Sequence, residues 1–542
     1  MNSRPGPGGL AALLLGVGGL TLAARVVGFG RSLVFSKTVG DTCLGDVYNA
    51  ANALPNVLFE VVAGGVLAGV VVPVVARHAG AGRRDEAGRT VSALLTWTLL
   101  VLSGAAVAAL LGAGAYARAY AKADCAGSAD VLAALLVMFV PQVWFYGLAV
   151  VCAGVLQAHG RFLAAAAGPL VSSLVVISGY VLFARLAAPG APVDLARLDR
   201  PALLALGLGT TAGVVALSLC TAVPLVRTGL RLRPSLRFAA GDARVIASIA
   251  GAGVAGLVLQ QVSVLVISWS AQRSPDPGAL TRFTWANAVY LLPYAVLAAP
   301  LLQLVFPRLA AASERDHERD GEEVVGLLRT YAPALVALAW LGAALLAATA
   351  VPVARVFVLG PGSGRTEALA GPVAAFAPAV VGFALLGLAS RTLLAAHAAL
   401  PAGITTAVAW GSVTVAALGL RVLVPTSALV TALAAAVSAG MALGAVLGWA
   451  LLVRRLPSRV DGLLPALLAG LLAALPAVLA GGLVARGATD AGLVVAAALA
   501  LAAAAATAVV YLGVLALVRP ALVRQVRAAL RGRGSQAEAS RA

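Results

Sequence analysis

Two arginines stand inside the first long apolar run of the chain, at Arg25 and Arg31. A charged side chain is costly in an apolar surrounding unless it faces a cavity or a partner, so both are candidates for a binding role. The guanidinium group suits phosphate, because its planar fork can give two parallel hydrogen bonds to phosphate oxygens. The two positions differ by about 240° around a regular helix, so they share one narrow face only if Gly28 and Gly30 bend it. The pair predicts a site for a charged, phosphate-bearing head group.

A stripe of polar residues runs along the second apolar segment. Its members are Asp46, Asn49, Asn52, Asn56 and Glu60. From Asn49 onward they follow the i, i+3, i+7, i+11 spacing that places side chains on one face of a helix. A polar stripe on an otherwise apolar helix predicts a water-lined cavity, so these five residues join the two arginines as candidate substrate-binding residues.

A purely structural alternative stays open for the same charges. Arg25 or Arg31 can pair with Asp46 or Glu60 to hold a helix bundle together, or can extend toward a membrane surface. Arginines alone do not identify a substrate, so the cavity and the structural ion pair both remain hypotheses at this point.

The elements that must position these residues are membrane-spanning helices. Of 542 residues, 61% are hydrophobic and only 11% are charged, whereas ordinary soluble domains carry about 25% charged residues. Apolar runs of about 20 residues, long enough to cross a hydrocarbon core as a helix, recur along the whole chain. We expect fourteen, which begin near Leu10, Tyr48, Thr90, Val131, Phe162, Ala202, Val245, Phe283, Val324, Pro372, Ala402, Ser427, Leu463 and Ala491. The predicted fold class is an all-α integral membrane protein.

The distribution of basic residues predicts the orientation. With fourteen spans and a cytoplasmic N-terminus, the inside loops hold about 25 of the 39 lysines and arginines and the outside loops about 12. Both termini are therefore expected in the cytoplasm. The net charge of +18 is placed beside helix ends, which favours topology and attraction to anionic membrane lipids over nucleic-acid binding. The tail after Pro520 is expected either as a short amphipathic helix on the inner leaflet or as a solvated segment.

The chain divides into four predicted parts. An N-terminal lobe covers 1–226, a C-terminal lobe covers 243–455, two further helices cover 460–518, and a basic cytoplasmic tail covers 519–542. A weak internal echo supports two parallel six-helix lobes with a cavity between them: Leu54-Pro55 and Leu292-Pro293 are each followed by a second proline, a basic residue and a charged loop.

The sequence contains no catalytic or metal-binding signature. Residues 360–366 read GPGSGRT, which lacks the lysine and spacing of a phosphate loop. We therefore expect no enzyme, no metal site and no cofactor.

Cys152 and Cys220 fall inside helices, whereas Cys43 and Cys125 fall in predicted outside loops, where they can form a disulfide or remain separate. The chain has only two lysines, Lys37 and Lys122, beside abundant alanine, glycine and arginine, and this composition indicates a GC-rich bacterial genome.

Three motifs in order resemble the MurJ/MviN family of lipid II flippases, which belongs to the multidrug/oligosaccharidyl-lipid/polysaccharide exporter superfamily. Residues 24–31 (ARVVGFGR) resemble the first-helix S-R-x-x-G-x-x-R-D pattern of the family. Asp46 and Leu54-Pro55-Asn56 match its D-A-F and L-P-N elements. Residues 155–162 (VLQAHGRF) with Gly168-Pro169 resemble its L-N-x-x-x-R-F junction and the proline that follows.

The resemblance implies a flippase in the bacterial plasma membrane that moves a lipid-linked cell-wall precursor from the inner to the outer leaflet by alternating access. It implies that Arg25 and Arg31 hold the pyrophosphate of the precursor, and that the helices from Leu463 onward form a groove for its lipid tail. The energy source stays open between membrane potential and a coupling ion held at Asp46 or Glu60. Other polyprenyl-phosphate-linked glycans and small amphiphiles exported with an ion are alternative cargoes.

The chain also departs from the family pattern, and the match is strong only through about residue 170. Phe59 stands where family members usually carry an arginine, and 63–65 read AGG in place of A-E-G. By spacing from Pro293, Ala288 replaces a cavity arginine and Asn287 replaces an acid. Of an R-x-F-Y-A…D…T-P pattern near the tenth helix, only Arg391 and Pro401 remain.

Overall fold

The computed structural model describes residues 7–61, 71, 75, 83–227, 230, 232–238, 254–315, 321–361 and 366–530. Within these ranges every regular element is a helix. The chain forms two compact units, which divide between Gly278 and Ala279. Gly360 and Pro361 are the exception, because they pack with the first unit.

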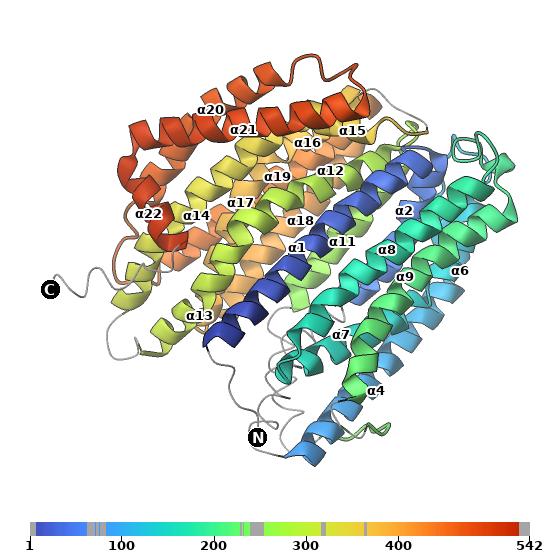
Figure 1. Ribbon diagram of the computed structural model, residues 1–542, viewed down its shortest axis with the longest axis horizontal. Coiled ribbons are helices and arrows are strands. Elements are labelled where there is room, and N and C mark those ends of the chain that lie inside the picture. The colour runs from blue at the N-terminus through green and yellow to red at the C-terminus, as the bar shows by residue number, and fades with distance from the viewer. Residues whose placement is uncertain are drawn as a thin grey trace. The chain divides into compact units, whose positions relative to one another are not determined.

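The described residues of the first unit form ten helical elements, which are coloured blue to green in Figure 1. They are α1 (Pro7–Thr38), α2 (Cys43–Phe59), α4 (Arg84–Leu111), α5 (Ala113–Tyr120), α6 (Ser128–Phe139), α7 (Gln142–Ala158), α8 (Phe162–Leu186), η2 (Leu195–Arg197), α9 (Arg200–Val226) and α11 (Val254–Gln272). Helix α8 packs along both α1 and α9, α7 packs on α4 and α9, and α2 packs on α6 and α11. Small residues allow close helix packing, as membrane helices require.

The second unit contains α12 (Ala279–Pro293), η3 (Tyr294–Ala298), α13 (Ala299–Arg315), α14 (Glu322–Ala348), α15 (Ala350–Phe357), α16 (Thr366–Ala375), α17 (Ala377–Ala395), α18 (Ala399–Leu423), η5 (Thr426–Ala428), α19 (Leu429–Val453), α20 (Leu463–Val484), α21 (Leu493–Val518) and α22 (Pro520–Leu530). The single π-helical turn η3 follows Pro293, which cannot donate a backbone hydrogen bond to a preceding turn. Helix α14 is the most buried candidate span.

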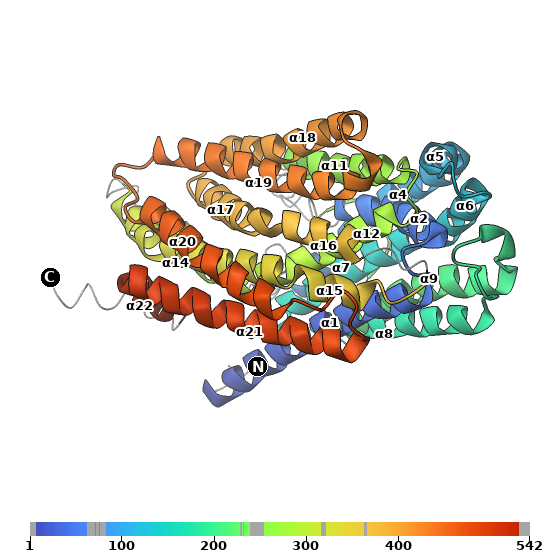
Figure 2. The ribbon, with the colours of Figure 1, turned by 90° about the horizontal axis from the view of Figure 1, so that it is seen from above.

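The C-terminal helices pack onto α14. Helices α20 and α21 lie against each other and along α14, and α22 contacts α14 and α21 (Figure 2). Leu522 and Ala529 of α22 are buried in these contacts. The beginning of the basic tail is thus a short helix, as one of the two expectations had it, and it packs on the second unit. Residues 531–542 lie outside the described residues.

The structure confirms the predicted fold class. Among the described residues, eleven helical segments are long and apolar enough to cross a membrane. The three remaining predicted spans coincide with α1, α2 and α11, so fourteen spans are consistent with the structure. The boundary between the packed units differs from the predicted ends of the lobes at 226 and 243 because α11 packs on α2. The predicted lobes are defined by the motion expected between them and not by packing, so this division of the chain stays a prediction.

Candidate functional site

The polar stripe lies on helix α2 as far as Asn56, and Glu60 is the residue that caps its C-terminal end. The helix starts at Thr42, whose hydroxyl oxygen accepts a hydrogen bond from the Gly45 amide at 3.2 Å, a standard N-terminal cap. Asp46 is fully buried, Glu60 is exposed, and the asparagines between them are half-buried. The solvent exposure of the predicted stripe therefore increases from Asp46 to Glu60.

Asp46 is engaged in a buried ion pair with Lys122. The Lys122 ammonium lies 2.8 Å from Asp46 Oδ2, and neither side chain is exposed. The same ammonium donates to the carbonyl of Asp276 at 2.7 Å, and the Gly278 amide donates to Asp46 Oδ2 at 2.9 Å. Removing one partner of such a pair costs about 3–5 kcal/mol, because it leaves a buried charge uncompensated. The sequence predicted an ion pair for Asp46 as an alternative, but with an arginine of the first helix.

A disulfide joins the same two segments. Cys43, the first residue of α2, is bonded to Cys125, with 5.9 Å between their Cα atoms. The bond connects positions 82 residues apart. The sequence had left this pairing open.

Helix α5 adds tyrosines beside the ion pair. The Tyr116 hydroxyl donates to the Ala50 carbonyl of α2 at 2.8 Å. The Tyr120 hydroxyl donates to the Leu265 carbonyl of α11 at 3.0 Å. Burial raises the pKa of Tyr120 to about 12, so this phenol keeps its proton at neutral pH. The two rings stack with centroids 4.1 Å apart. Both α2 and α11 are therefore held by α5 and the connection that follows it.

The middle of the stripe is lined by polar groups with spare hydrogen-bonding capacity. Tyr146 of α7 contacts Asn56 Oδ1 at 3.4 Å, and its ring stacks on Phe59 at 4.5 Å between centroids. Asn52 Oδ1 is buried and accepts no hydrogen bond among the described residues. Buried acceptors are normally satisfied by protein, water or a ligand. The stripe therefore offers a polar group to something other than the surrounding side chains.

The two arginines of α1 have different environments. Helix α1 is unbroken from Pro7 to Thr38, so Gly28 and Gly30 do not interrupt it. Arg25 is exposed and Arg31 is half-buried, which agrees with their different angular positions on the helix. Arg31 is near enough to the Tyr146 and Tyr180 hydroxyls to interact with them electrostatically. The structure thus brings Arg31, but not Arg25, to the interior that the α2 stripe lines.

The second unit holds the remaining family positions. Asn287 and Ala288 are half-buried on α12, and the same helix carries a buried arginine, Arg282, that sequence reasoning did not single out. Arg391 of α17 is near enough to the Tyr294 hydroxyl to interact with it electrostatically. Residues 63–65, where the acid of the family pattern is missing, lie outside the described residues.

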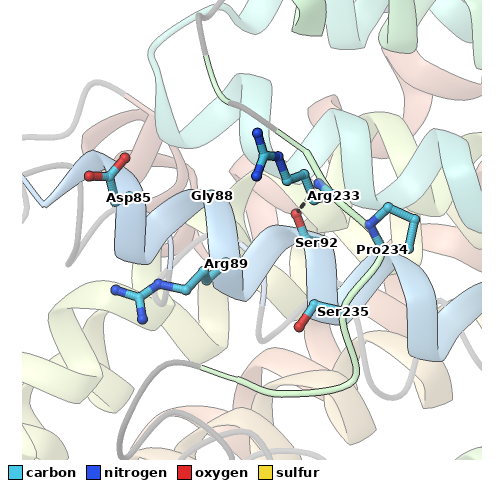
Figure 3. Close-up of a pocket in the computed structure, with 7 residues that line it drawn as sticks. All are labelled: Asp85, Gly88, Arg89, Ser92, Arg233, Pro234 and Ser235. Atoms are coloured by element: carbon cyan, nitrogen blue, oxygen red, sulfur yellow. Dashed lines mark hydrogen bonds between the residues drawn. The ribbon is translucent and has the colours of Figure 1, made fainter.

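A shallow cavity of about 290 Å³ lies at the start of α4, as Figure 3 shows. An extended strap, residues 232–238, forms one wall of it. The Arg233 amide donates to Ser92 Oγ at 3.0 Å, and the Ser235 amide donates to Thr96 Oγ1 at 3.2 Å. Trp97 Nε1 donates to the Leu236 carbonyl at 3.1 Å. Arg89 of α4 and Arg233 of the strap both line this cavity.

Besides Arg282, sequence reasoning missed the role of Lys122 and the tyrosines around α2. A lysine directly after an apolar stretch in a chain with two lysines was a usable signal. Within the described part of the chain, no group of three or more His, Cys, Asp or Glu residues could hold a metal ion.

Comparisons with known proteins agree on one family. The model of the family described as lipid II flippase MurJ matches residues 35–516. A probable lipid II flippase MurJ of Rhizobium tropici is 27% identical over 333 residues, which are 60% of each chain. The lipid II flippase MurJ of Burkholderia cenocepacia is 28% identical over 305 residues, 55% of this chain and 57% of that protein. The chain thus aligns with somewhat more than half the length of these relatives.

Solved structures extend the likeness to the whole fold. A lipid II flippase MurJ in an inward closed conformation matches with a TM-score of 0.70 at 16% identity, over 94% of this chain and 99% of that one. An inward-facing multidrug resistance transporter of the MATE family, in the MOP superfamily, matches with a TM-score of 0.63 at 15% identity, over 80% of this chain and 97% of that one. At these identities the likeness shows the fold alone.

Proposed function

The chain belongs to the lipid II flippase MurJ family, and from this premise we propose that it moves lipid II from the inner to the outer leaflet of a bacterial plasma membrane. The observation that carries the proposal is the family match over 35–516. It is supported by Tyr146, which contacts Asn56 of the half-buried α2 stripe and interacts electrostatically with Arg31. The transported molecule is lipid-linked and carries pyrophosphate, so its polar head needs a polar path and its tail needs lipid.

In this proposal Arg31 binds the pyrophosphate. Its guanidinium fork supplies paired donors, and the half-buried environment strengthens them relative to water. Asn52 and Asn56 offer amide donors and acceptors to the sugar hydroxyls or phosphates along the same path. Arg25, exposed on another face of α1, makes a first contact with the head group before it reaches the interior.

The two C-terminal helices suit the lipid tail. Helix α20 exposes a row of leucines at spacings of three and four residues, which lie on one face. They are Leu464, Leu468, Leu472, Leu475 and Leu479. In our proposal this apolar face, within 460–518, guides the polyprenyl chain while the lobes at 1–226 and 243–455 alternate access to the head group.

The disulfide supports the orientation. Disulfides persist in oxidising compartments and are rare in the cytosol. In our proposal the N-terminal end of α2, which carries the Cys43–Cys125 bond, lies on the outer side of the membrane, and α1, which precedes it, starts on the inner side. With fourteen spans the C-terminus is also cytoplasmic.

The chain acts as a transporter rather than an enzyme in this proposal, with membrane potential or a coupling ion as the energy source. Asp46 is already neutralised by Lys122. Glu60, exposed at the other end of the stripe, is therefore the better acid for an ion or proton to occupy. Membrane potential alone would supply about 2.3 kcal/mol per charge moved through 100 mV.

The test is complementation of a bacterium depleted of its own lipid II flippase. The parent chain and Arg185→Ala, an exposed arginine at the end of α8, should restore growth and outer-leaflet lipid II. Arg31→Ala should fail at equal membrane abundance, and Arg25→Ala should be weakened. Failure of the correctly inserted parent chain to restore outer-leaflet lipid II would overturn the proposed cargo.

A further inference from the structure

The outer end of α2 is tied twice to one short stretch of chain. Cys43 is bonded to Cys125, and Asp46, one helical turn later, pairs with Lys122. In both segments the two linked residues are three positions apart. One link is covalent and the other is ionic, and both are buried.

A third segment of the chain is hydrogen-bonded to the same ion pair. The Lys122 ammonium donates to the Asp276 carbonyl, and Asp46 accepts from the Gly278 amide. Gly278 has a φ of +82°, and a Cβ there would lie 2.3 Å from the Asp41 carbonyl oxygen. Only glycine fits this position, so the last residue of the first unit is held tightly against the start of α2.

The two anchors fix the rotation of α2. At about 100° per residue, Cys43 and Asp46 lie about 60° apart around the helix, and the asparagine stripe is centred about 80° from Asp46. Turning the stripe in either direction would pull on both anchors. The direction in which Asn49, Asn52 and Asn56 point is therefore set at the outer end of the helix.

We propose that Lys122 is a positioning residue for the α2 stripe, and that its ion pair with Asp46 is energetically coupled to the Cys43–Cys125 disulfide. Lys122 does not touch the transported molecule. It acts through Asp46, by keeping the first turn of α2 where the two sulfur atoms meet and where the stripe faces the interior. The statement about the stripe rests on the proposed function, whereas the coupling does not.

The coupling is reciprocal, as linkage requires. An intact ion pair holds the two cysteines close and raises their effective concentration toward each other. An intact disulfide likewise holds Asp46 and Lys122 in register. Losing one link should therefore weaken the other by the same factor.

The first experiment measures the disulfide equilibrium in the full-length chain in lipid nanodiscs, in a Cys152→Ala, Cys220→Ala background. Dithiothreitol reduces the bond by passing two electrons and two protons to it, which gives two cysteine thiols and the cyclic oxidised reagent. Quenching with a maleimide of known mass counts the thiols at each ratio of reduced to oxidised reagent.

We expect Lys122→Met to lower the equilibrium constant for disulfide formation at least tenfold. Arg118→Met, which removes an exposed basic side chain from the preceding helix, should leave it unchanged. Lys122→Arg should restore most of the loss, since it keeps the charge. Asp46→Asn with Lys122→Met, which removes both charges of the pair, should still show a loss. An unchanged equilibrium in both Lys122→Met and the double variant would overturn the coupling.

The second experiment measures transport in the depleted bacterium under oxidising conditions. Lys122→Met and Cys43→Ser with Cys125→Ser should each lower outer-leaflet lipid II, and their combination should be less than multiplicative because both remove the same constraint. If the redox shift is seen while every one of these variants transports normally, Lys122 has no positioning role. If the parent chain does not transport at all, the proposed function fails while the redox result still decides the coupling.

Discussion

Gly179 of α8 and Gly209 of α9 lie so close that neither helix has room for a side chain at the crossing. A Cβ at Gly179 would lie 2.9 Å from the Cα of Gly209, and the reverse distance is 2.7 Å. Backbone stands on both sides, so no flexible side chain can move away. This contact sets the distance between two helices that carry Tyr180 and Thr210, the partners of α2.

Gly209→Ala should therefore destabilise the protein by about 1–3 kcal/mol through overpacking. The measurement is thermal unfolding of the purified chain in detergent, reported by tryptophan fluorescence. Gly104→Ala is the matched control, because no atom lies within 4 Å of its added Cβ on α4. That control should be neutral or slightly stabilising, since alanine favours helix. Equal melting temperatures for the two variants would contradict the close contact.

Tyr48, Tyr180 and Thr210 form a directed chain of hydroxyl groups. The Thr210 hydroxyl gives its one proton to the Leu206 carbonyl at 2.8 Å, so it must accept from Tyr48 at 2.9 Å. Tyr48 has then used its own proton and accepts from Tyr180 at 2.8 Å. Tyr48 thus stands in the middle of the chain.

Tyr48→Phe should therefore cost more stability than Tyr180→Phe. The first breaks two buried hydrogen bonds and the second breaks one, at about 1 kcal/mol each with a further penalty for every group left unsatisfied. Chemical unfolding of both variants and of the double variant measures this. The double variant should cost less than the sum of the singles, because the bond between the two tyrosines is lost only once. A larger loss for Tyr180→Phe would contradict the central place of Tyr48 in the chain.

The strap along α4 depends on two hydroxyl groups. Ser92→Ala with Thr96→Ala removes the acceptors of the Arg233 and Ser235 amides. Hydrogen exchange at these two amides should then be faster by about tenfold or more, because each bond contributes about 1 kcal/mol to holding the strap closed. The control is Ser178→Ala, whose hydroxyl bonds only to its own helix. Unchanged exchange at both amides would show that the strap is held by other contacts.

The sequence was sufficient for the fold class because hydropathy and segment length are local properties. The same holds for the α2 stripe, since the spacing of Asn49, Asn52 and Asn56 is a property of one helix. The partner of Asp46 was not predictable in this way. Lys122 is 76 residues distant, and only the packing of α2, α6 and α11 brings the two together. The cysteine pairing stayed open for the same reason.

Substitution of Asn52 should affect substrate binding without affecting the stability of the fold. Its Oδ1 accepts no hydrogen bond among the described residues, so Asn52→Leu should change the free energy of unfolding by less than about 1 kcal/mol. If the stripe binds the head group of lipid II, the same variant should lower outer-leaflet lipid II several-fold in the complementation assay. Asn49→Leu is the comparison variant, because it removes an existing hydrogen bond. The Asn49 side-chain amide donates to the Gly45 carbonyl of its own helix at 2.9 Å. A stable Asn52→Leu variant with undiminished transport would exclude this position from the path of the head group.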